Sequence, residues 1–133
     1  ITDADGIRAM QDVVETVEAT PDVVDSAVRI VEATRAHDAL EVGASPRGSL
    51  ALIRLARASA AVAGRRFATP DDVKSLAVPA LAHRLVLRTE AWVRGVREDA
   101  VVVECLESVP TPASLTSDDE AAAVRAEVPT GTA

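Results

Sequence analysis

Apolar residues recur every three or four positions in five segments of this chain, which is the spacing of helices with one buried face. The first segment begins near Thr2 and Asp3 and runs to about Val17. The second opens at Thr20-Pro21-Asp22 and continues to about Arg35. We expect two sets of side chains to point inward, Ile7, Met10, Val13, Val14 and Val17 from the first segment and Val23, Val24, Ala27, Val28 and Val31 from the second.

A third, longer apolar segment follows the sequence Gly43-Ala44-Ser45-Pro46-Arg47-Gly48. Ser45 is a favourable N-cap and Pro46 suits the first helical position, so a helix should begin here and can end at Gly64. Because its residues are apolar or small on nearly every side, we expect a buried central helix. Its arginines share one stripe, roughly a quarter-turn wide at the helical period, that we expect to meet water or a partner: Arg47, Arg54 and Arg57.

The remaining pattern predicts two further helices. One opens at Thr69-Pro70-Asp71-Asp72, where Thr69 and Asp72 have the spacing of a capping box, and Pro79 either kinks it or begins a new segment. Residues 85–87 are too short to distinguish a strand from a helix end. The last helix runs from about Glu98 to Ser108 and buries Cys105. We therefore predict an all-α fold, a small bundle of about five helices, with one very short strand left open.

The sequence changes character after Pro110, where proline, serine and threonine replace the helical pattern. We expect two parts, a helical domain over residues 1–112 and a flexible acidic tail over residues 113–133. The chain also begins without methionine, at Ile1, and we interpret it as a piece of a longer protein.

Composition excludes several classes of protein. A net charge of −7 argues against a nucleic-acid-binding surface, which should be basic. A single cysteine excludes an internal disulfide and fits a reducing cytoplasm. No apolar run approaches the roughly 18 residues of a membrane span, and two histidines and one cysteine in no ligand spacing predict no metal site. Aromatic residues make up 2% of the chain, so its core must be aliphatic; we expect Trp92 to cap the edge of that core.

Phosphate-binding motifs are missing from the chain. It contains no Gly-x-x-x-x-Gly-Lys-[Ser/Thr] loop and no Gly-x-Gly-x-x-Gly turn, nor an apolar strand that ends in paired acids. On its own, therefore, this sequence should not hold a nucleoside triphosphate and its magnesium ion in the usual way.

Five short motifs, in order, resemble the C-terminal part of MoxR-family AAA+ ATPases: Thr34-Arg35-Ala36-His37, Gly43-Ala44-Ser45-Pro46-Arg47-Gly48, Gly64-Arg65-Arg66, Thr69-Pro70-Asp71-Asp72-Val73 and Leu81-Ala82-His83-Arg84-Leu85. The resemblance spans Ile1 to about Pro112. It implies the helical lid that follows an α/β nucleotide-binding core, whose phosphate loop, Walker B acids, sensor 1 and arginine finger would lie upstream of Ile1.

The resemblance also assigns residues. It makes Gly43, Ala44, Ser45, Pro46 and Arg47 the sensor-2 segment that binds nucleotide, and Arg47 the catalytic residue that reaches the γ-phosphate. ATP and Mg²⁺ are implied for the full-length parent, with none expected on this fragment. The implied parent is an ATPase that remodels partner proteins as a chaperone does, whereas the fragment alone should be inactive.

The implied partners are the upstream core, neighbouring subunits of a hexameric ring and von Willebrand factor A-domain proteins. Arg54 and Arg57 could contact the core or the next subunit, or simply be solvated. Arg35 could favour the C-terminal end of its helix or lie near nucleotide. Two rival interpretations remain, a free-standing helical protein-interaction module without nucleotide and, disfavoured by acidity, a helix-turn-helix DNA binder.

Overall fold

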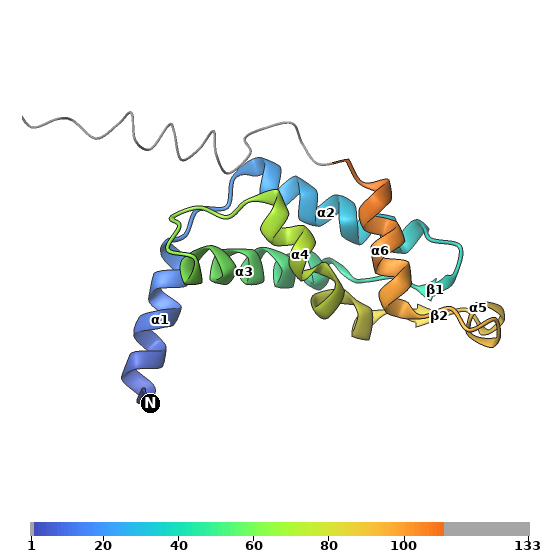
Figure 1. Cartoon of the computed structure of the whole chain (residues 1–133), viewed down its shortest axis with the longest axis horizontal. Coiled ribbons are helices and arrows are strands. Elements are labelled where there is room, and N and C mark those ends of the chain that lie inside the picture. The colour runs from blue at the N-terminus through green and yellow to red at the C-terminus, as the bar shows by residue number, and fades with distance from the viewer. Residues whose placement is uncertain (1, 111–133) are drawn as a thin grey trace, which may run out of the picture.

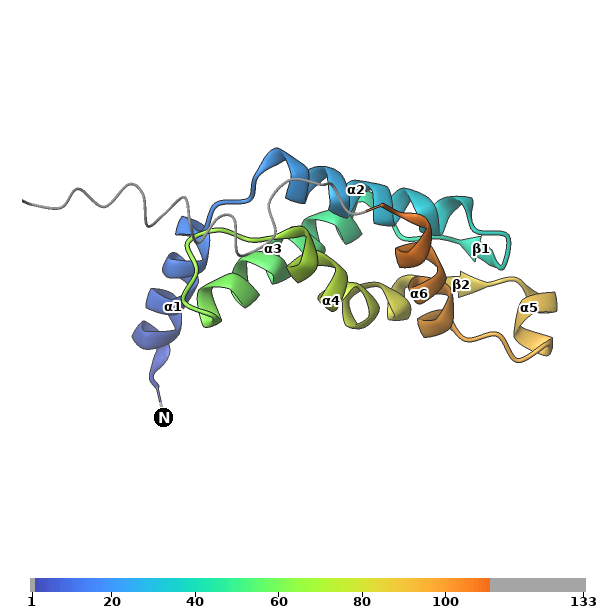
Figure 2. The same ribbon diagram turned by 45° about the horizontal axis from the view of Figure 1, so that its top comes forward.

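Helices dominate residues 2–110, the part of the chain that the computed structural model describes (Figures 1 and 2). The elements are α1 (Ala4–Thr16), α2 (Pro21–Ala36), β1 (Leu40–Val42), α3 (Pro46–Val62), α4 (Pro70–Leu81), the 3₁₀ turn η1 (Ala82–Arg84), β2 (Val86–Leu87), α5 (Thr89–Val93) and α6 (Glu98–Ser108). This confirms the all-α prediction. The predicted tail, residues 113–133, lies outside the described part.

The two short strands pair antiparallel, with Leu40 opposite Leu87 and Val42 opposite Val86. Residues 85–87 therefore do contribute to a strand, which was one of the two alternatives that the pattern left open. The pairing ties the segment before α3 to the segment after η1, so the sheet fixes where the chain enters α3.

Helix α3 is central, because it packs against α1, α2 and α4, while α6 packs against α2 and α4. One face of α3 is buried in an aliphatic core through Leu52, Ala56 and Ala60. Gly48 shares this face, and a Cβ atom there would lie 3.0 Å from Leu81 Cδ2 and 3.3 Å from Ala44 Cβ. The absence of a side chain at residue 48 therefore lets the first turn of α3 sit directly on its neighbours.

The prediction that α3 is buried nearly all round is wrong. Leu50 is 57% exposed and Val62 is 92% exposed, and both lie away from the buried face. Periodicity failed here because alanine is small enough to tolerate either environment, so an alanine-rich helix conceals which of its sides faces the core.

Helix α1 departs most from expectation. It begins where predicted, and Asp3 caps it by accepting a hydrogen bond from the Gly6 N–H at 2.8 Å. None of its residues is buried, however, and α1 projects from the body like an arm (Figures 1 and 2). Ile7, Met10 and Val13, predicted to point inward, are 50–59% exposed. The pattern predicted an amphipathic helix correctly, but the described residues offer nothing that covers its apolar face.

Two further burial predictions are wrong. Val24 of α2 is exposed. Trp92 does not cap the edge of the core, because it lies on the five-residue α5, at the end of the molecule opposite α1, with 70% of its surface exposed (Figure 1). The sequence did not predict α5, since five residues are too few to show a helical period.

The predicted capping box at the start of α4 is confirmed. The Thr69 hydroxyl accepts from the Asp72 N–H at 3.3 Å, while the Asp72 carboxylate accepts from the Thr69 N–H at 2.8 Å. Helix α4 then continues through Pro79 to Leu81. Helices α2 and α3 also begin with a Ser/Thr-Pro pair, but neither Thr20 nor Ser45 makes a side-chain capping hydrogen bond.

The same Asp72 carboxylate joins the end of α3 to the start of α4. Gly64, at φ +72°, ends α3 and turns the chain so that Arg65 faces Asp72. The Arg65 guanidinium donates to both carboxylate oxygens, at 2.7 and 2.8 Å, and the Ser59 hydroxyl donates at 3.0 Å. Burial alone would raise the pKa of Asp72, but hydrogen bonds from Arg65, Thr69 and Ser59 outweigh it and lower the pKa to about 2.

Candidate functional site

The segment between β1 and α3 lies directly on the last turn of α2. A Cβ atom at Gly43 would come within 2.6 Å of the Arg35 Cα and 2.7 Å of the Thr34 carbonyl oxygen. Real Cβ atoms do not approach backbone so closely, so residue 43 must be glycine for reasons of space. The close approach sets the distance between the loop backbone and α2.

Thr34 then fixes the position of the loop along α2. Its hydroxyl accepts a hydrogen bond from the Ala44 N–H at 3.0 Å and donates to the Val31 carbonyl at 2.7 Å. Thr34 and Ala44 are both completely buried, so the interaction is shielded from competing water. The backbone that leads into α3 is thereby held rigidly against α2.

His37 acts upstream of this loop, at the turn between α2 and β1. Its Nδ1 accepts from the Ala39 N–H at 3.2 Å, which leaves the proton on Nε2 for donation to Glu104 at 3.0 Å. Glu104 belongs to α6, so this contact ties the turn between α2 and β1 to α6. Gly43 and Thr34 are the residues that hold the loop itself before α3 begins.

Arg47 stands at the end of this rigid loop, in the first turn of α3, where its side chain is exposed. Within residues 2–110 its guanidinium has no hydrogen-bond or ion-pair partner. Because the Ser45 side chain does not cap α3, a free cation and an uncapped helix N-terminus lie together. Both attract anions, so this end of α3 is suited to contact a phosphate group supplied from outside the described residues.

The other candidate arginines fall into two groups. Arg35 is exposed beside the loop and lines a groove between α2 and α3 together with Pro46 and Ser49. Arg54 and Arg57 instead line a cleft between α3 and α1, where Arg57 lies 3.6 Å from Glu15. The structure thus brings Arg35 to the Gly43–Arg47 loop and places Arg54 and Arg57 at the arm.

Sequence reasoning missed the residues that hold this loop and the turn before it. Thr34 belonged to a motif, but nothing in the local pattern indicated that its hydroxyl binds Ala44, ten positions away. The His37–Glu104 contact joins residues 67 positions apart. A motif that combines a threonine with a glycine nine residues later is the one signal that could have suggested such a contact.

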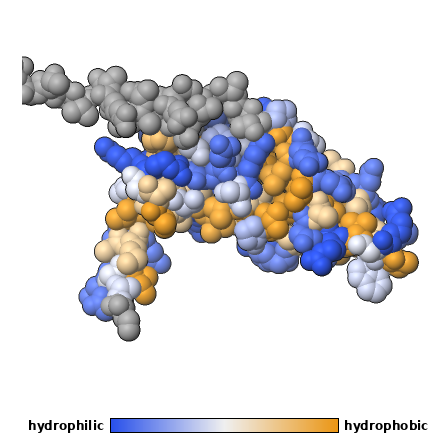
Figure 3. Space-filling view, viewed as in Figure 1, coloured by the Kyte–Doolittle hydropathy of each residue, from blue (hydrophilic) through white to orange (hydrophobic). Residues whose placement is uncertain are grey.

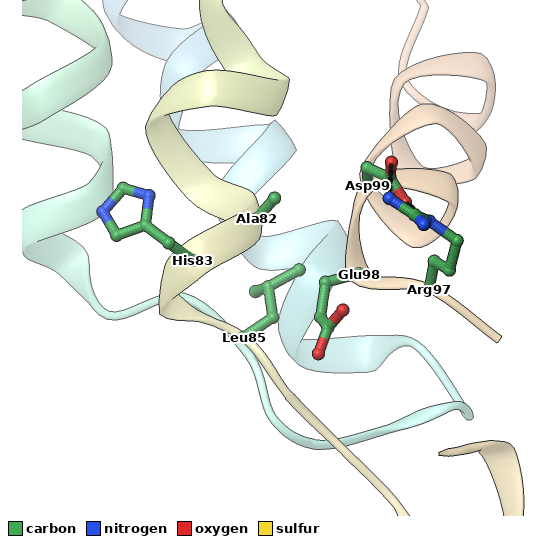
Figure 4. Close-up of a pocket in the computed structure, with 6 residues that line it drawn as sticks. All are labelled: Ala82, His83, Leu85, Arg97, Glu98 and Asp99. Atoms are coloured by element: carbon green, nitrogen blue, oxygen red, sulfur yellow. Dashed lines mark hydrogen bonds and ion pairs between the residues drawn. The ribbon is translucent and has the colours of Figure 1, made fainter. Parts of the chain in front are cut away.

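A second hollow, between η1 and the start of α6, has different chemistry (Figure 4). Arg97 and Asp99 pair with each other there at 3.0 Å, and Arg97 lowers the pKa of the Asp99 carboxyl. The exposed His83 ring points away from this pair (Figure 4). These charges already satisfy one another, which distinguishes the hollow from the unpaired Arg47.

The described residues contain neither a metal-binding cluster nor a membrane-spanning helix. No group of three His, Cys, Asp or Glu side chains there is arranged to hold a metal ion. Likewise, none of the helices described is both long and apolar enough to cross a membrane.

The family model described as "AAA lid domain" matches residues 32–105, which include the loop and the central helix α3, so the chain is an AAA lid domain. The chain is 38% identical over 103 residues to Uncharacterized protein YeaC of Bacillus subtilis, covering 77% of this chain and 32% of that one. It is 37% identical over 99 residues to Chaperone MoxR1 of Mycobacterium tuberculosis, covering 68% and 26%.

The structural comparison agrees. A crystal structure of a proposed ATPase from Cytophaga hutchinsonii has a TM-score of 0.71 at 26% identity, over 74% of this chain and 33% of that one. The chain belongs to the lid domains of the MoxR family of AAA+ ATPases. It spans about a third or less of the length of the curated relatives that it matches.

Proposed function

We propose that this chain is the C-terminal lid of a MoxR-type AAA+ ATPase and that Arg47 is its sensor-2 arginine. The lid closes over ATP bound by an upstream α/β core and couples hydrolysis to chaperone-like remodelling of other proteins. The observation that carries this proposal is the geometry of Arg47, an unpaired cation in the first turn of α3, directly after a loop that Gly43 and Thr34 hold against α2.

The described residues fit part of an ATP site. Arg47 offers a guanidinium suited to phosphate, and residues 43–46 bring the backbone to the same place without bulky side chains. No cluster of acids in residues 2–110 suits Mg²⁺, so the metal and the remaining phosphate contacts belong to the core. ATP, when bound there, supplies the phosphate charge that Arg47 is placed to meet.

The role of this chain is then to position one charge. Gly43 and Thr34 hold the loop, so the backbone that carries Arg47 is already in place before the phosphate is bound. An arginine positioned in advance stabilises negative charge most effectively when that charge develops during phosphoryl transfer. When no terminal phosphate is present, Arg47 loses its partner and the lid is free to open. Arg35, beside the loop, is a further candidate for contact with the core.

The wider assembly forms part of the same proposal. We assign residues 1–112 to the lid; the predicted tail, residues 113–133, lies outside the described residues. The parent works in the cytoplasm as a hexameric ring, with von Willebrand factor A-domain proteins among its partners. The relative MoxR1 is named a chaperone, which supports the chaperone-like part of this proposal.

The test is Arg47→Ala in the full-length protein. Loss of one well-placed charged donor should lower the steady-state rate of ATP hydrolysis by roughly 10²–10³. Stability should change by less than about 0.5 kcal/mol, because Arg47 is exposed and unpaired.

Arg54→Ala is the matched control, since Arg54 is also exposed and lies on the same stripe about 10 Å further along α3. It should leave turnover nearly intact. Equal losses in the two variants would mean that Arg47 acts through docking of the lid and not through the terminal phosphate, and normal turnover in Arg47→Ala would refute the role of that residue.

A further inference from the structure

The apolar face of α1, formed by Ile7, Met10 and Val13, is the largest discrepancy between the sequence and the described fold. These three side chains are each at least half exposed. Apolar residues gather along the arm and at its junction with the body (Figure 3). A helix of 13 residues is marginally stable alone, and its stability normally comes from packing its apolar face. Something outside residues 2–110 should therefore cover this face.

Side chains at the junction between α1 and α3 also lack partners. Ile7, Met10 and Val14 line a cleft of about 330 Å³ together with Arg54 and Arg57. The Nε atom of Arg57 is buried there and has no hydrogen-bond partner within the described residues, although buried guanidinium nitrogens are normally paired. The cleft thus combines an exposed apolar face with an arginine whose Nε is left without a partner in the described residues.

Two observations identify the partner that belongs there. The relatives extend well beyond the region they share with this chain, which covers 32% of YeaC and 26% of MoxR1. The α1 face is also continuous with the Arg47 side of α3, because Arg54 lines the cleft and shares a stripe with Arg47. One body in contact with Arg47 can therefore extend along α3 to α1.

We propose that the apolar face of α1 packs permanently against the α/β nucleotide-binding core and serves as the pivot of the lid. This inference rests on the proposed function. Arg47 and Arg57 are ten residues apart on α3, which separates the two contacts by about 15 Å. The contact at Arg47 depends on phosphate charge, whereas the contact at α1 is apolar and does not. The lid therefore swings at its Arg47 end while its α1 end stays docked.

The test uses the thiol reactivity of Met10→Cys in the full-length protein and in the 133-residue chain. Asp12→Cys is the control, because position 12 lies on the opposite, polar side of α1. The native Cys105 is buried, so the unsubstituted chain supplies the background. In the isolated chain both introduced thiols should react quickly with a maleimide dye.

In the full-length protein the thiol at position 10 should react at least about tenfold more slowly than in the isolated chain. A tenfold change corresponds to a docking free energy of about 1.4 kcal/mol. The slowing should be the same with ATP, with ADP and without nucleotide, while the thiol at position 12 stays fast. Three results would overturn the proposal: no slowing, slowing only with ATP, or slowing in the isolated chain that grows with its concentration, which would identify a second copy as the partner.

These results are distinct from those that decide the role of Arg47. If position 10 is protected and the Arg47→Ala variant has normal activity, α1 docks on the core but Arg47 is not the sensor-2 arginine. If position 10 is exposed and the Arg47→Ala variant is inactive, Arg47 keeps its role but α1 does not dock on the core.

Discussion

Replacement of Asp72 with asparagine tests how the two central helices are joined. The carboxylate accepts hydrogen bonds from Arg65, Ser59 and Thr69, and these contacts lower its pKa from 3.8 to about 2. A difference of this size corresponds to about 2 kcal/mol of folding free energy at about 1.36 kcal/mol per pKa unit. Asparagine keeps the shape but removes the charge, so Asp72→Asn should lower the free energy of unfolding at pH 7 by about 2 kcal/mol.

The dependence on pH has a definite sign. Because the pKa of Asp72 is lower in the folded state, its stabilisation is fully present above pH 3.8 and is lost as the pH falls through about 2. Urea unfolding of the wild-type and Asp72→Asn chains should therefore give curves that converge in acid. About half of the difference should be gone by pH 3.

Asp71→Asn is the matched control, because Asp71 is the exposed neighbour of Asp72 in the first turn of α4. It should change stability by about 0.5 kcal/mol or less. The reasoning would be refuted if both substitutions cost the same at pH 7, or if the effect of Asp72→Asn were as large at pH 3 as at pH 7.

Three further predictions follow from the loop, the core and the missing phosphate contacts. Gly43→Ala should lower the free energy of unfolding by roughly 1–3 kcal/mol, because the new Cβ would lie 2.6 Å from the Arg35 Cα. An unchanged melting temperature would show that the loop shifts freely. Burial raises the pKa of the Cys105 thiol, so at pH 8 it should react with an aromatic disulfide far more slowly in the native chain than in urea. Equal rates would place it at the surface. The isolated chain should hydrolyse no ATP and bind it weakly, and a low-micromolar Kd by calorimetry would contradict this.

The sequence predicted those parts of the fold that depend on local signals. Helical periodicity located α2, α3 and α6, and the Thr69–Asp72 spacing located the capped start of α4. It could not predict α5, which is shorter than two helical turns. Nor could it tell that the apolar face of α1 would stay exposed, because periodicity shows that a face exists and not what covers it.

For the candidate site, the sequence indicated the residues but not the contacts that hold them in place. The resemblance singled out the Gly43–Arg47 segment and Arg47 in particular, and that role remains a proposal. The contacts that hold the segment and the turn before it join residues far apart in the chain, Thr34 with Ala44 and His37 with Glu104. The first pair arises only when the loop before α3 folds back onto α2, and the second only when α2 and α6 pack together, so no local pattern contains them.

The central claim is that Arg47 contacts the terminal phosphate of ATP, and nucleotide discrimination tests it most directly. The affinities of the full-length protein for a non-hydrolysable ATP analogue and for ADP should be measured with Arg47 and with Arg47→Ala. A lost hydrogen bond to a charged group costs about 1.5–3 kcal/mol, so the preference for the analogue over ADP should fall by roughly 10- to 150-fold. The affinity for ADP itself should not change. An equal loss of affinity for both nucleotides, or no loss for either, would contradict the account.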